Sequence, residues 1–334
     1  MSRFDVAIVG GGPAGLDAAL VLGRMRRRVL LLDADDPAHA PSEGVHGLFG
    51  HDGTPPLELR RLARQQLRPY ESVTVRMVAA EAVRKTPGGF SVLADGEQDI
   101  AGVLLLATGV RYELPPIEGA AEVWARGVFH CPYCHGWEVR DRPLAAYGTD
   151  AAGLALLLTS LSRDVVLLTD GDSNLDPDDE RRLTSAGVEI RGDRVAGLEA
   201  EGGRLARIRF ADGWSDDRAG LFYAPRFTPS PLPAQLGCEL DEGGMMVIDD
   251  DGRTSVPGVF AAGDATVGKA AVVLAAAAGS RAAYAINAEL AHGTLPGGSR
   301  LRRGVQGPAA GRKRLARYPD SDRPRSSSAS SWSR

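Results

Sequence analysis

Two cysteines three residues apart, Cys131 and Cys134, are the residues of this chain best suited to redox chemistry. A histidine lies directly on either side of the pair, His130 and His135, and Cys238 is the only other cysteine. So few cysteines exclude a disulfide framework, and an isolated Cys-x-x-Cys pair indicates redox or metal chemistry. Zinc prefers four ligands in a tetrahedron, and histidines adjoining the cysteines are poor partners for that geometry. Redox chemistry is therefore favoured, and no metal is predicted.

Pro132, between the two sulfurs, suits the first turn of a helix. Cys131 would then lie at the N-terminus of that helix, where the dipole stabilises a thiolate. A neutral imidazole at His135 could deprotonate an incoming thiol, and its imidazolium could protonate a leaving one. The alternative for His130 and His135 is an exposed polar side chain without a catalytic role.

The N-terminal residues form a complete dinucleotide-binding fingerprint. Its parts in order are a strand at residues 4–9, the glycines Gly10, Gly12 and Gly15, a helix at 16–23, a strand at 29–32 and an acid, Asp33. The first glycine permits a tight turn, the second lets the backbone approach the pyrophosphate, and the third lets helix and strand pack closely. The helix N-terminus binds the phosphates and the acid takes the ribose hydroxyls.

The same succession of elements occurs twice, which predicts an α/β protein with two Rossmann-like three-layer domains. The second copy has a strand at 144–147, a helix at 154–161 and a strand at 165–168. In each copy further strands and a closing strand follow. They are expected at 73–83, 90–93 and 103–106 in the first copy, and at 188–191, 195–198, 205–210 and 220–223 in the second. Strands at 247–249 and 256–264 and a small-residue helix at 270–290 come last.

Charge is distributed unevenly along the chain. The formal net charge is -4, but residues 294–334 contain ten Lys or Arg and two Asp, which leaves the preceding residues at -12. An acidic body argues against nucleic acid as a partner. The tail lacks an apolar period and ends in a serine-rich run, so disorder is expected there. No apolar run is long enough to span a bilayer and no signal peptide is evident, which together favour a cytoplasmic protein.

Taken together, four motifs resemble those of the low-molecular-weight thioredoxin reductase family of flavoproteins. They are the N-terminal fingerprint, Ala107-Thr108-Gly109, Cys131-Pro132-Tyr133-Cys134 and Gly263-Asp264. The resemblance implies that the first fingerprint, including Pro13 and Ala14, holds FAD, and that Asp264 contacts its ribityl chain. It also implies an inserted NAD(P)-type domain that carries the cysteine pair. The expected division is an FAD-binding domain at 1–113 and 246–293, the insert at 114–245 and the basic tail at 294–334.

Two departures from the reductase pattern distinguish this chain. Ala146 replaces the first glycine of the second fingerprint, and the acids Asp170 and Asp172 stand where the family places a basic cluster for the 2′-phosphate of NADPH. NAD(P)H is therefore a doubtful cofactor, although Asp170 could serve as a ribose ligand for NADH. The motif Cys-Pro-Tyr-Cys-His-Gly resembles the dithiol oxidase branch of the family, the gliotoxin and holomycin type.

The resemblance favours an FAD-dependent dithiol oxidase that closes a disulfide in a small molecule, with oxygen as acceptor. It implies that Cys134 is the flavin-proximal sulfur and Cys131 the sulfur that meets the substrate. One alternative is an NAD(P)H-dependent reductase of the thioredoxin reductase type, acting on a thioredoxin-like protein. Another is a non-catalytic flavoprotein redox sensor. The family resemblance also implies a homodimer.

Overall fold

A computed structural model describes residues 2–171, 173–266 and 270–295. Most of the tail and Asp172 thus lie outside the described residues. Seven helices are present in the described ranges, which are α1 (Pro13–Arg24), α2 (Pro56–Leu67), α3 (Pro132–His135), α4 (Ala152–Leu158), α5 (Pro177–Ser185), α6 (Leu232–Leu236) and α7 (Val272–His292). Two short 3₁₀ helices, η1 (Trp137–Val139) and η2 (Gly263–Ala265), accompany them.

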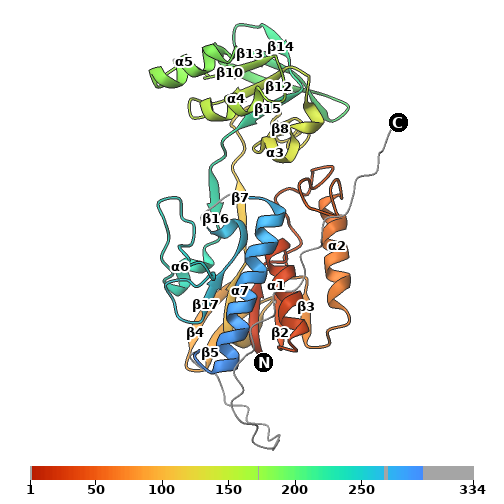
Figure 1. Ribbon diagram of the computed structural model, residues 1–334, viewed down its shortest axis with the longest axis vertical. Coiled ribbons are helices and arrows are strands. Elements are labelled where there is room, and N and C mark those ends of the chain that lie inside the picture. The colour runs from red at the N-terminus through yellow and green to blue at the C-terminus, as the bar shows by residue number, and fades with distance from the viewer. Residues whose placement is uncertain (1, 172, 267–269, 296–334) are drawn as a thin grey trace, which may run out of the picture. The chain divides into compact units, whose positions relative to one another are not determined.

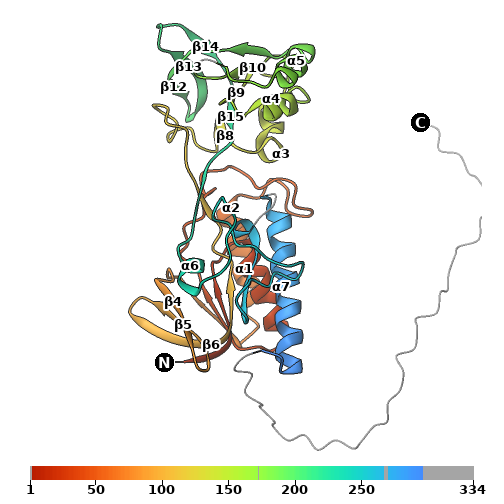
Figure 2. The ribbon, with the colours of Figure 1, turned by 90° about the vertical axis from the view of Figure 1, so that its left-hand side faces the viewer.

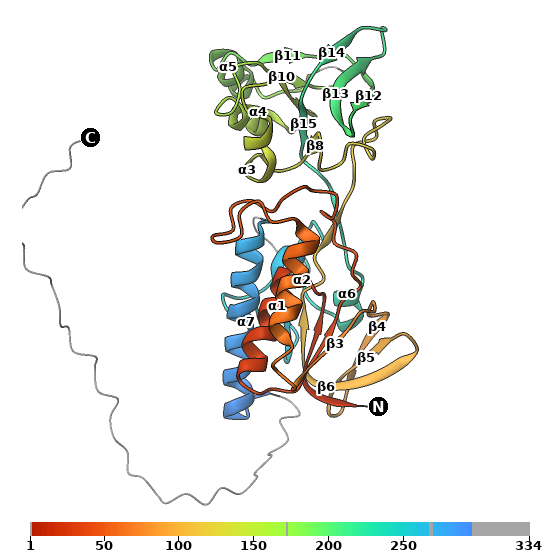
Figure 3. The same ribbon diagram turned by 90° about the vertical axis from the view of Figure 1, so that its right-hand side faces the viewer.

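The first α/β layer is a seven-stranded sheet in the order β3-β2-β1-β6-β5-β4, with β17 also paired to β6. Its strands are β1 (Arg3–Val9), β2 (Val29–Leu32), β3 (Val73–Arg76), β4 (Ala82–Thr86), β5 (Gly89–Ala94), β6 (Glu97–Leu106) and β17 (Val259–Ala261). The pairs that join β1, β2, β3, β6 and β17 are parallel, whereas β4, β5 and β6 form an antiparallel meander. Figure 1 and Figure 3 show α1, α2 and α7 together on one face of this sheet.

The strands β2 and β17 and the C-terminal halves of β1 and β6 are buried on both faces, as their continuous apolar runs require. In β1, Val6 and Ile8 pack toward α1 and α7, whereas Ala7 and Val9 pack into the opposite core. That opposite core also contains Leu232, part of the segment that follows the second sheet. Figure 2 shows the β4–β5 hairpin and α6 on the side of the seven-stranded sheet that faces away from α1 and α7. The first fingerprint is therefore anchored at the centre of a two-sided core.

The second α/β layer is a five-stranded parallel sheet in the order β11-β10-β9-β15-β8. Its strands are β8 (Val128–Phe129), β9 (Leu144–Tyr147), β10 (Val165–Leu168), β11 (Glu189–Arg191) and β15 (Gly220–Tyr223). On one face pack α4 and α5, and on the other packs a three-stranded sheet of β12 (Val195–Glu201), β13 (Arg204–Phe210) and β14 (Ser215–Asp217). All of these strands come between β6 and β17 in the sequence. A two-stranded sheet of β7 (Val110–Tyr112) and β16 (Phe227–Pro229) completes the described strands.

The predicted α/β class with two Rossmann-like folds is confirmed, but some predicted strands are wrong. The run at 73–83 is two strands, β3 and β4, that lie at opposite edges of the sheet order. Residues 247–249 form no strand, because the Val247 N–H donates to the Glu239 carbonyl oxygen and the Asp249 N–H to that of Arg253, so no single neighbouring strand pairs with them. The strand expected at 256–264 is limited to β17, since the glycine at 263 has φ +77° and begins a 3₁₀ turn. The domain boundaries at 113 and 245 stay a prediction.

None of the helices in the described ranges is long and apolar enough to cross a membrane.

Candidate active site

The glycine turn between β1 and α1 forms one wall of a cavity. Gly10 has φ +113°, and a Cβ there would lie 2.1 Å from the Ala107 carbonyl oxygen. A Cβ at Gly15 would lie 1.9 Å from the Gly10 oxygen, so this glycine lets α1 approach β1 closely. Gly12 has no atom within 4 Å of the Cβ position and lines the cavity. The backbone there is open to a ligand, as a pyrophosphate cradle requires.

Asp33, at the end of β2, is buried and lines the same cavity. Its carboxylate accepts hydrogen bonds from Arg60 Nη2 at 2.6 Å, from Arg64 Nη1 at 3.1 Å and from the Asp35 backbone N–H at 2.9 Å. Arg60 is also buried, and its Nη1 lies 3.0 Å from a carboxylate oxygen of Asp35 as an ion pair, without hydrogen-bond geometry. Two arginines thus hold Asp33, the predicted ribose ligand. A ribose hydroxyl that donates to Asp33 would bind carboxylate oxygens that also accept from these arginines.

Breaking this ion pair should destabilise the protein strongly. Arg60→Met should lower the free energy of unfolding by about 3 kcal/mol, because the buried Asp33 carboxylate then keeps only Arg64 as a positively charged partner. Arg61→Met is the matched control, since Arg61 is exposed and pairs only with Glu58 one turn away, and it should change stability by less than about 0.5 kcal/mol. Urea unfolding of the FAD-loaded protein measures both. Equal losses in the two variants would contradict this account of the pair.

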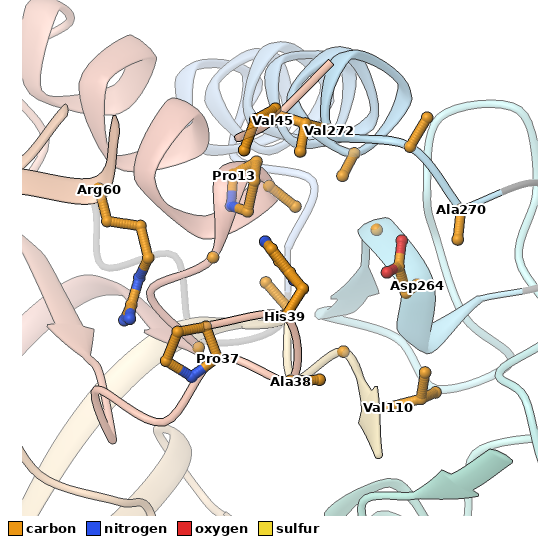
Figure 4. Close-up of a pocket in the computed structure, with 18 of the residues that line it drawn as sticks. Pro13, Pro37, Ala38, His39, Val45, Arg60, Val110, Asp264, Ala270 and Val272 are labelled. Atoms are coloured by element: carbon orange, nitrogen blue, oxygen red, sulfur yellow. The ribbon is translucent and has the colours of Figure 1, made fainter. Parts of the chain in front are cut away.

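Beside the glycine turn, the cavity is lined by residues that follow β6 and β17. Ala107, Thr108 and Gly109 follow β6, and Gly263 and Asp264 follow β17, and all five line the cavity. Thr108 Oγ1 is buried without a hydrogen-bond partner in the described part of the chain. Burial raises the pKa of Asp264, whose carboxylate faces into the cavity in Figure 4.

These features fit FAD. A buried hydroxyl without a partner and an open glycine cradle need polar partners from a ligand. The predicted cofactor residues lie on this cavity, except Gly15, whose position instead serves helix packing. The lining members are Gly10, Gly12, Pro13, Ala14, Asp33, Ala107, Thr108, Gly109, Gly263 and Asp264. The cavity thus fits FAD, and the roles of the individual residues stay a prediction.

The cysteine pair reaches this cavity through α3. Cys131 is the N-cap of that helix and Pro132 its first residue, as expected. The two sulfurs lie 2.6 Å apart as free thiols, and Cys134 lines the cavity, whereas Cys131 does not. The hydrogen bond from Cys134 lowers the pKa of Cys131 to about 7, while the same contact and burial raise the pKa of Cys134. Cys131 therefore carries the first negative charge of the reduced pair.

Both histidines beside the pair line the cavity and are partly buried, so His135 is not the exposed side chain that the alternative expected. His135 stacks on Phe129 with ring centroids 4.8 Å apart, and its Nε2 lies 3.2 Å from Ser42 Oγ. His130 stacks on Tyr112 at 4.5 Å. Desolvation lowers the pKa of each histidine to about 4, so both imidazoles are neutral at pH 7.

Four further residues of the cavity have no motif in the sequence, namely His39, Ser42, Arg60 and Tyr112. Figure 4 shows His39 and Arg60 on the cavity beside Pro37 and Asp264. His39 and Ser42 lie in a glycine- and proline-rich loop without periodicity, and Arg60 lies in an amphipathic helix, α2, of which Pro56, Arg60 and Leu67 are the buried residues. Only the closeness of this loop to the fingerprint in the sequence hinted at their role. Among the described residues, no cluster of His, Cys, Asp or Glu is arranged to hold a metal.

Comparison with known proteins supports the same conclusion. The profile of the pyridine nucleotide-disulphide oxidoreductase family matches residues 4–282. The chain is 31% identical to thioredoxin reductase aclD of Aspergillus oryzae, over 86% of this chain and 96% of that one. It is 30% identical to thioredoxin reductase sirT of Leptosphaeria maculans, over 86% and 94%.

Solved structures with the same fold include two with substantial sequence identity. The crystal structure of HlmI has a TM-score of 0.82 at 38% identity and covers 87% of this chain and 93% of that one. An oxidoreductase from Agrobacterium tumefaciens has a TM-score of 0.82 at 34% identity, with 87% and 99% covered. The predicted family is confirmed. The chain belongs to the pyridine nucleotide-disulphide oxidoreductases and, within them, to the thioredoxin reductase-like, FAD-dependent disulfide oxidoreductases.

Proposed function

We propose that the protein is an FAD-dependent dithiol oxidase that forms a disulfide in a small-molecule dithiol, with oxygen as the terminal acceptor. The observation that carries the proposal is the state of Asp170, the acid that follows β10. Its Oδ2 accepts a hydrogen bond from Tyr147 Oη at 2.9 Å, and its Oδ1 accepts one from the Val195 backbone N–H at 2.8 Å. These two hydrogen bonds fix the carboxylate at the end of β10, where its negative charge repels the 2′-phosphate of NADPH.

The turn between β9 and α4 argues in the same direction. Asp150 is exposed in that turn, and its Oδ1 would lie 2.8 Å from a Cβ on Gly148. A carboxylate at the place where a second fingerprint binds pyrophosphate repels that group. Arg181 and Arg182 lie on the solvated helix α5 and pair with its own acids, so they are not directed at this turn. Binding of NAD(P)H is therefore disfavoured, and electrons from the substrate dithiol are the proposed source.

The proposed chemistry is thiol–disulfide exchange at Cys131. A substrate thiol loses its proton to His135 and its sulfur attacks the Cys131 sulfur of the oxidised pair. A bond forms between these two sulfurs, the Cys131–Cys134 bond breaks, and Cys134 leaves as a thiolate facing the cofactor cavity. The second substrate thiol then loses its proton to the Cys134 thiolate and attacks the substrate sulfur bound to Cys131. The bond between that sulfur and Cys131 breaks, Cys131 leaves as a thiolate, and the substrate disulfide is released with the pair reduced. FAD, when bound, supplies the two-electron acceptor for the reduced pair.

Because several relatives are named thioredoxin reductases, the second candidate function is an NAD(P)H-dependent disulfide reductase. Anaerobic stopped-flow mixing separates the two. The oxidised enzyme is mixed with NADPH, NADH or dithiothreitol while flavin absorbance is followed. Bleaching by dithiothreitol alone, with hydrogen peroxide produced on admission of air, is expected. Rapid bleaching by either nicotinamide cofactor would contradict the proposal.

A further inference from the structure

His39 lines the cofactor cavity and has no part in the thiol–disulfide exchange. It belongs to the loop between β2 and α2, and Figure 4 shows its side chain projecting into the cavity. The side chain is partly buried, and within the described part of the chain its ring makes no hydrogen bond. A polar ring that faces an open cavity without a protein partner is available to a ligand.

The positive charge of Arg60 is already balanced by acids. No other arginine or lysine in the described ranges lines the cavity. Its guanidinium lies 2.6 Å from an oxygen of Asp33, 3.0 Å from one of Asp35 and 3.2 Å from the Gly11 carbonyl oxygen. Arg64 pairs with the same two acids. These four charged side chains together are neutral, so they offer no net positive charge to a ligand.

The other histidines on the cavity wall do not supply that charge either. Burial lowers the pKa of His130 and of His135 to about 4, so both rings are neutral at pH 7. His46 lies between two carboxylates, at 3.4 and 3.5 Å. His39 is thus the basic group of the described wall that has no acidic partner and can gain a proton near neutral pH.

FAD brings the negative charge of its diphosphate into this cavity. The N-terminus of α1 supplies only about half an elementary charge to balance it. The acids on the wall are already accounted for, because Asp33 is paired with arginines, Asp36 pairs with Arg111 at 2.6 Å, and burial raises the pKa of Asp264, which favours its neutral form. A further positive charge near the diphosphate would therefore strengthen FAD binding.

We propose that His39 is a cofactor-binding residue whose imidazolium pairs with the diphosphate of FAD, so that FAD binding takes up a proton and weakens as the pH rises. In this step the imidazole gains one proton from solvent, and no covalent bond to FAD forms or breaks. The pairing is the same for an oxidase and for a reductase, so the inference goes beyond the proposed function.

The direction of the pH dependence follows from the two states of His39. Without FAD, burial and the charge of Arg60 lower the pKa of His39, so its ring is neutral at pH 7. An anion beside the ring raises the pKa in the complex. The dissociation constant for FAD therefore rises between these two pKa values, by up to about tenfold per pH unit for one proton. Tyr112 and Cys134 also line the cavity, but their raised pKa values keep them protonated at pH 6 to 8.

His51 provides the matched control. It belongs to the same loop as His39, but it is exposed and does not line the cavity. His51→Gln thus makes the same chemical change away from the ligand, whereas His39→Gln removes the titrating group and keeps a polar side chain.

The test measures FAD binding to the full chain after its FAD has been removed. Fluorescence titration from pH 6 to 8 gives the dissociation constant, and calorimetry at pH 7 in two buffers of different ionisation enthalpy gives the proton uptake. In wild type and His51→Gln the dissociation constant should rise with pH, and FAD binding should take up a proton. His39→Gln should bind FAD about tenfold to a hundredfold more weakly at pH 6, the difference should shrink toward pH 8, and the uptake should be lost.

A wild type that takes up no proton would overturn the proposal without any variant. Equal pH dependence in wild type and His39→Gln would also overturn it. So would a loss of affinity in His39→Gln that is the same at every pH, because His39 would then bind FAD in its neutral form. These outcomes are distinct from failure of the proposed function, since flavin bleaching by NADPH would refute the oxidase and leave every FAD dissociation constant unchanged.

Discussion

Cys134→Ala should abolish flavin bleaching by dithiothreitol, with the rate falling at least a thousandfold, while bound FAD is retained. The pair cannot close a disulfide without the second sulfur, and Cys134 is the sulfur that lines the cofactor cavity. Anaerobic stopped-flow absorbance measures the rate, and the flavin-to-protein absorbance ratio measures retention. A rate within tenfold of wild type would remove the pair from the mechanism.

The same variant should change the chemistry of Cys131. The pKa of Cys131 is lowered to about 7 mainly by the hydrogen bond from Cys134, so removal of that donor should raise the pKa toward its ordinary value. Alkylation of the reduced protein by iodoacetamide, followed from pH 5 to 10, should show a midpoint near 7 in wild type and at least one unit higher in Cys134→Ala. Cys238 serves as an internal control. It is buried and its pKa is raised, so it should stay unmodified in the folded protein. Equal midpoints would contradict the proposed stabilisation of the thiolate.

Gly279→Ala should be severely destabilising and should weaken FAD binding. Gly279 lies in α7 where that helix crosses α1, and a Cβ there would lie 2.0 Å from the Ala14 carbonyl oxygen. Backbone cannot move aside as the end of a side chain can, so the helices must separate, which should lower the free energy of unfolding by about 3 kcal/mol. Ala14 lines the cofactor cavity next to the glycine turn, so its displacement should also raise the dissociation constant for FAD.

Gly153→Ala is the control for this substitution, and its expected effect has the opposite sign. Gly153 also lies in a helix, α4, but is exposed and has no atom within 4 Å of its Cβ position. Alanine there should stabilise the protein by about 0.5–1 kcal/mol through helix propensity alone. Thermal unfolding with flavin fluorescence as the probe compares the two variants. A similar change in both would mean that α1 and α7 are not in backbone contact.

The parts of the fold that the sequence predicted well are contiguous in it. The first strand of the fingerprint, Arg3–Val9, and the strand Leu144–Tyr147 each have a continuous apolar run. Such a run bounded by turn residues predicts a buried parallel strand from the local sequence alone. The segment at 247–249 was also predicted as a strand from its apolar residues, but Ile248 packs against the core without a strand ladder. Apolar alternation alone does not distinguish these two outcomes.

The site was only partly predictable for a related reason. The cysteines, the glycine turn and Asp264 belong to local motifs that can be recognised one at a time. The contacts of Ser42 with His135 and of Arg60 with Asp33 join residues 93 and 27 positions apart, and neither serine nor arginine has a distinctive spacing around it. Their roles depend on which loops the folded sheets bring together, and that information is absent from any short stretch of sequence.

The topology of the first sheet has a consequence for the order in which the chain folds during synthesis. The strands β1 to β6 emerge first, but their sheet gains β17 and their helix face gains α7 only after the five strands of the second sheet have been made. The second sheet is contiguous in the chain and has its own core on both faces, so it can fold as it leaves the ribosome. The first sheet cannot be completed until residues more than 250 positions away from its first strand have been made. Until then, the face that α7 later covers stays partly exposed. The segment from β17 to the start of α7 therefore completes the cofactor site, and a nascent chain cannot bind FAD before that segment has been made.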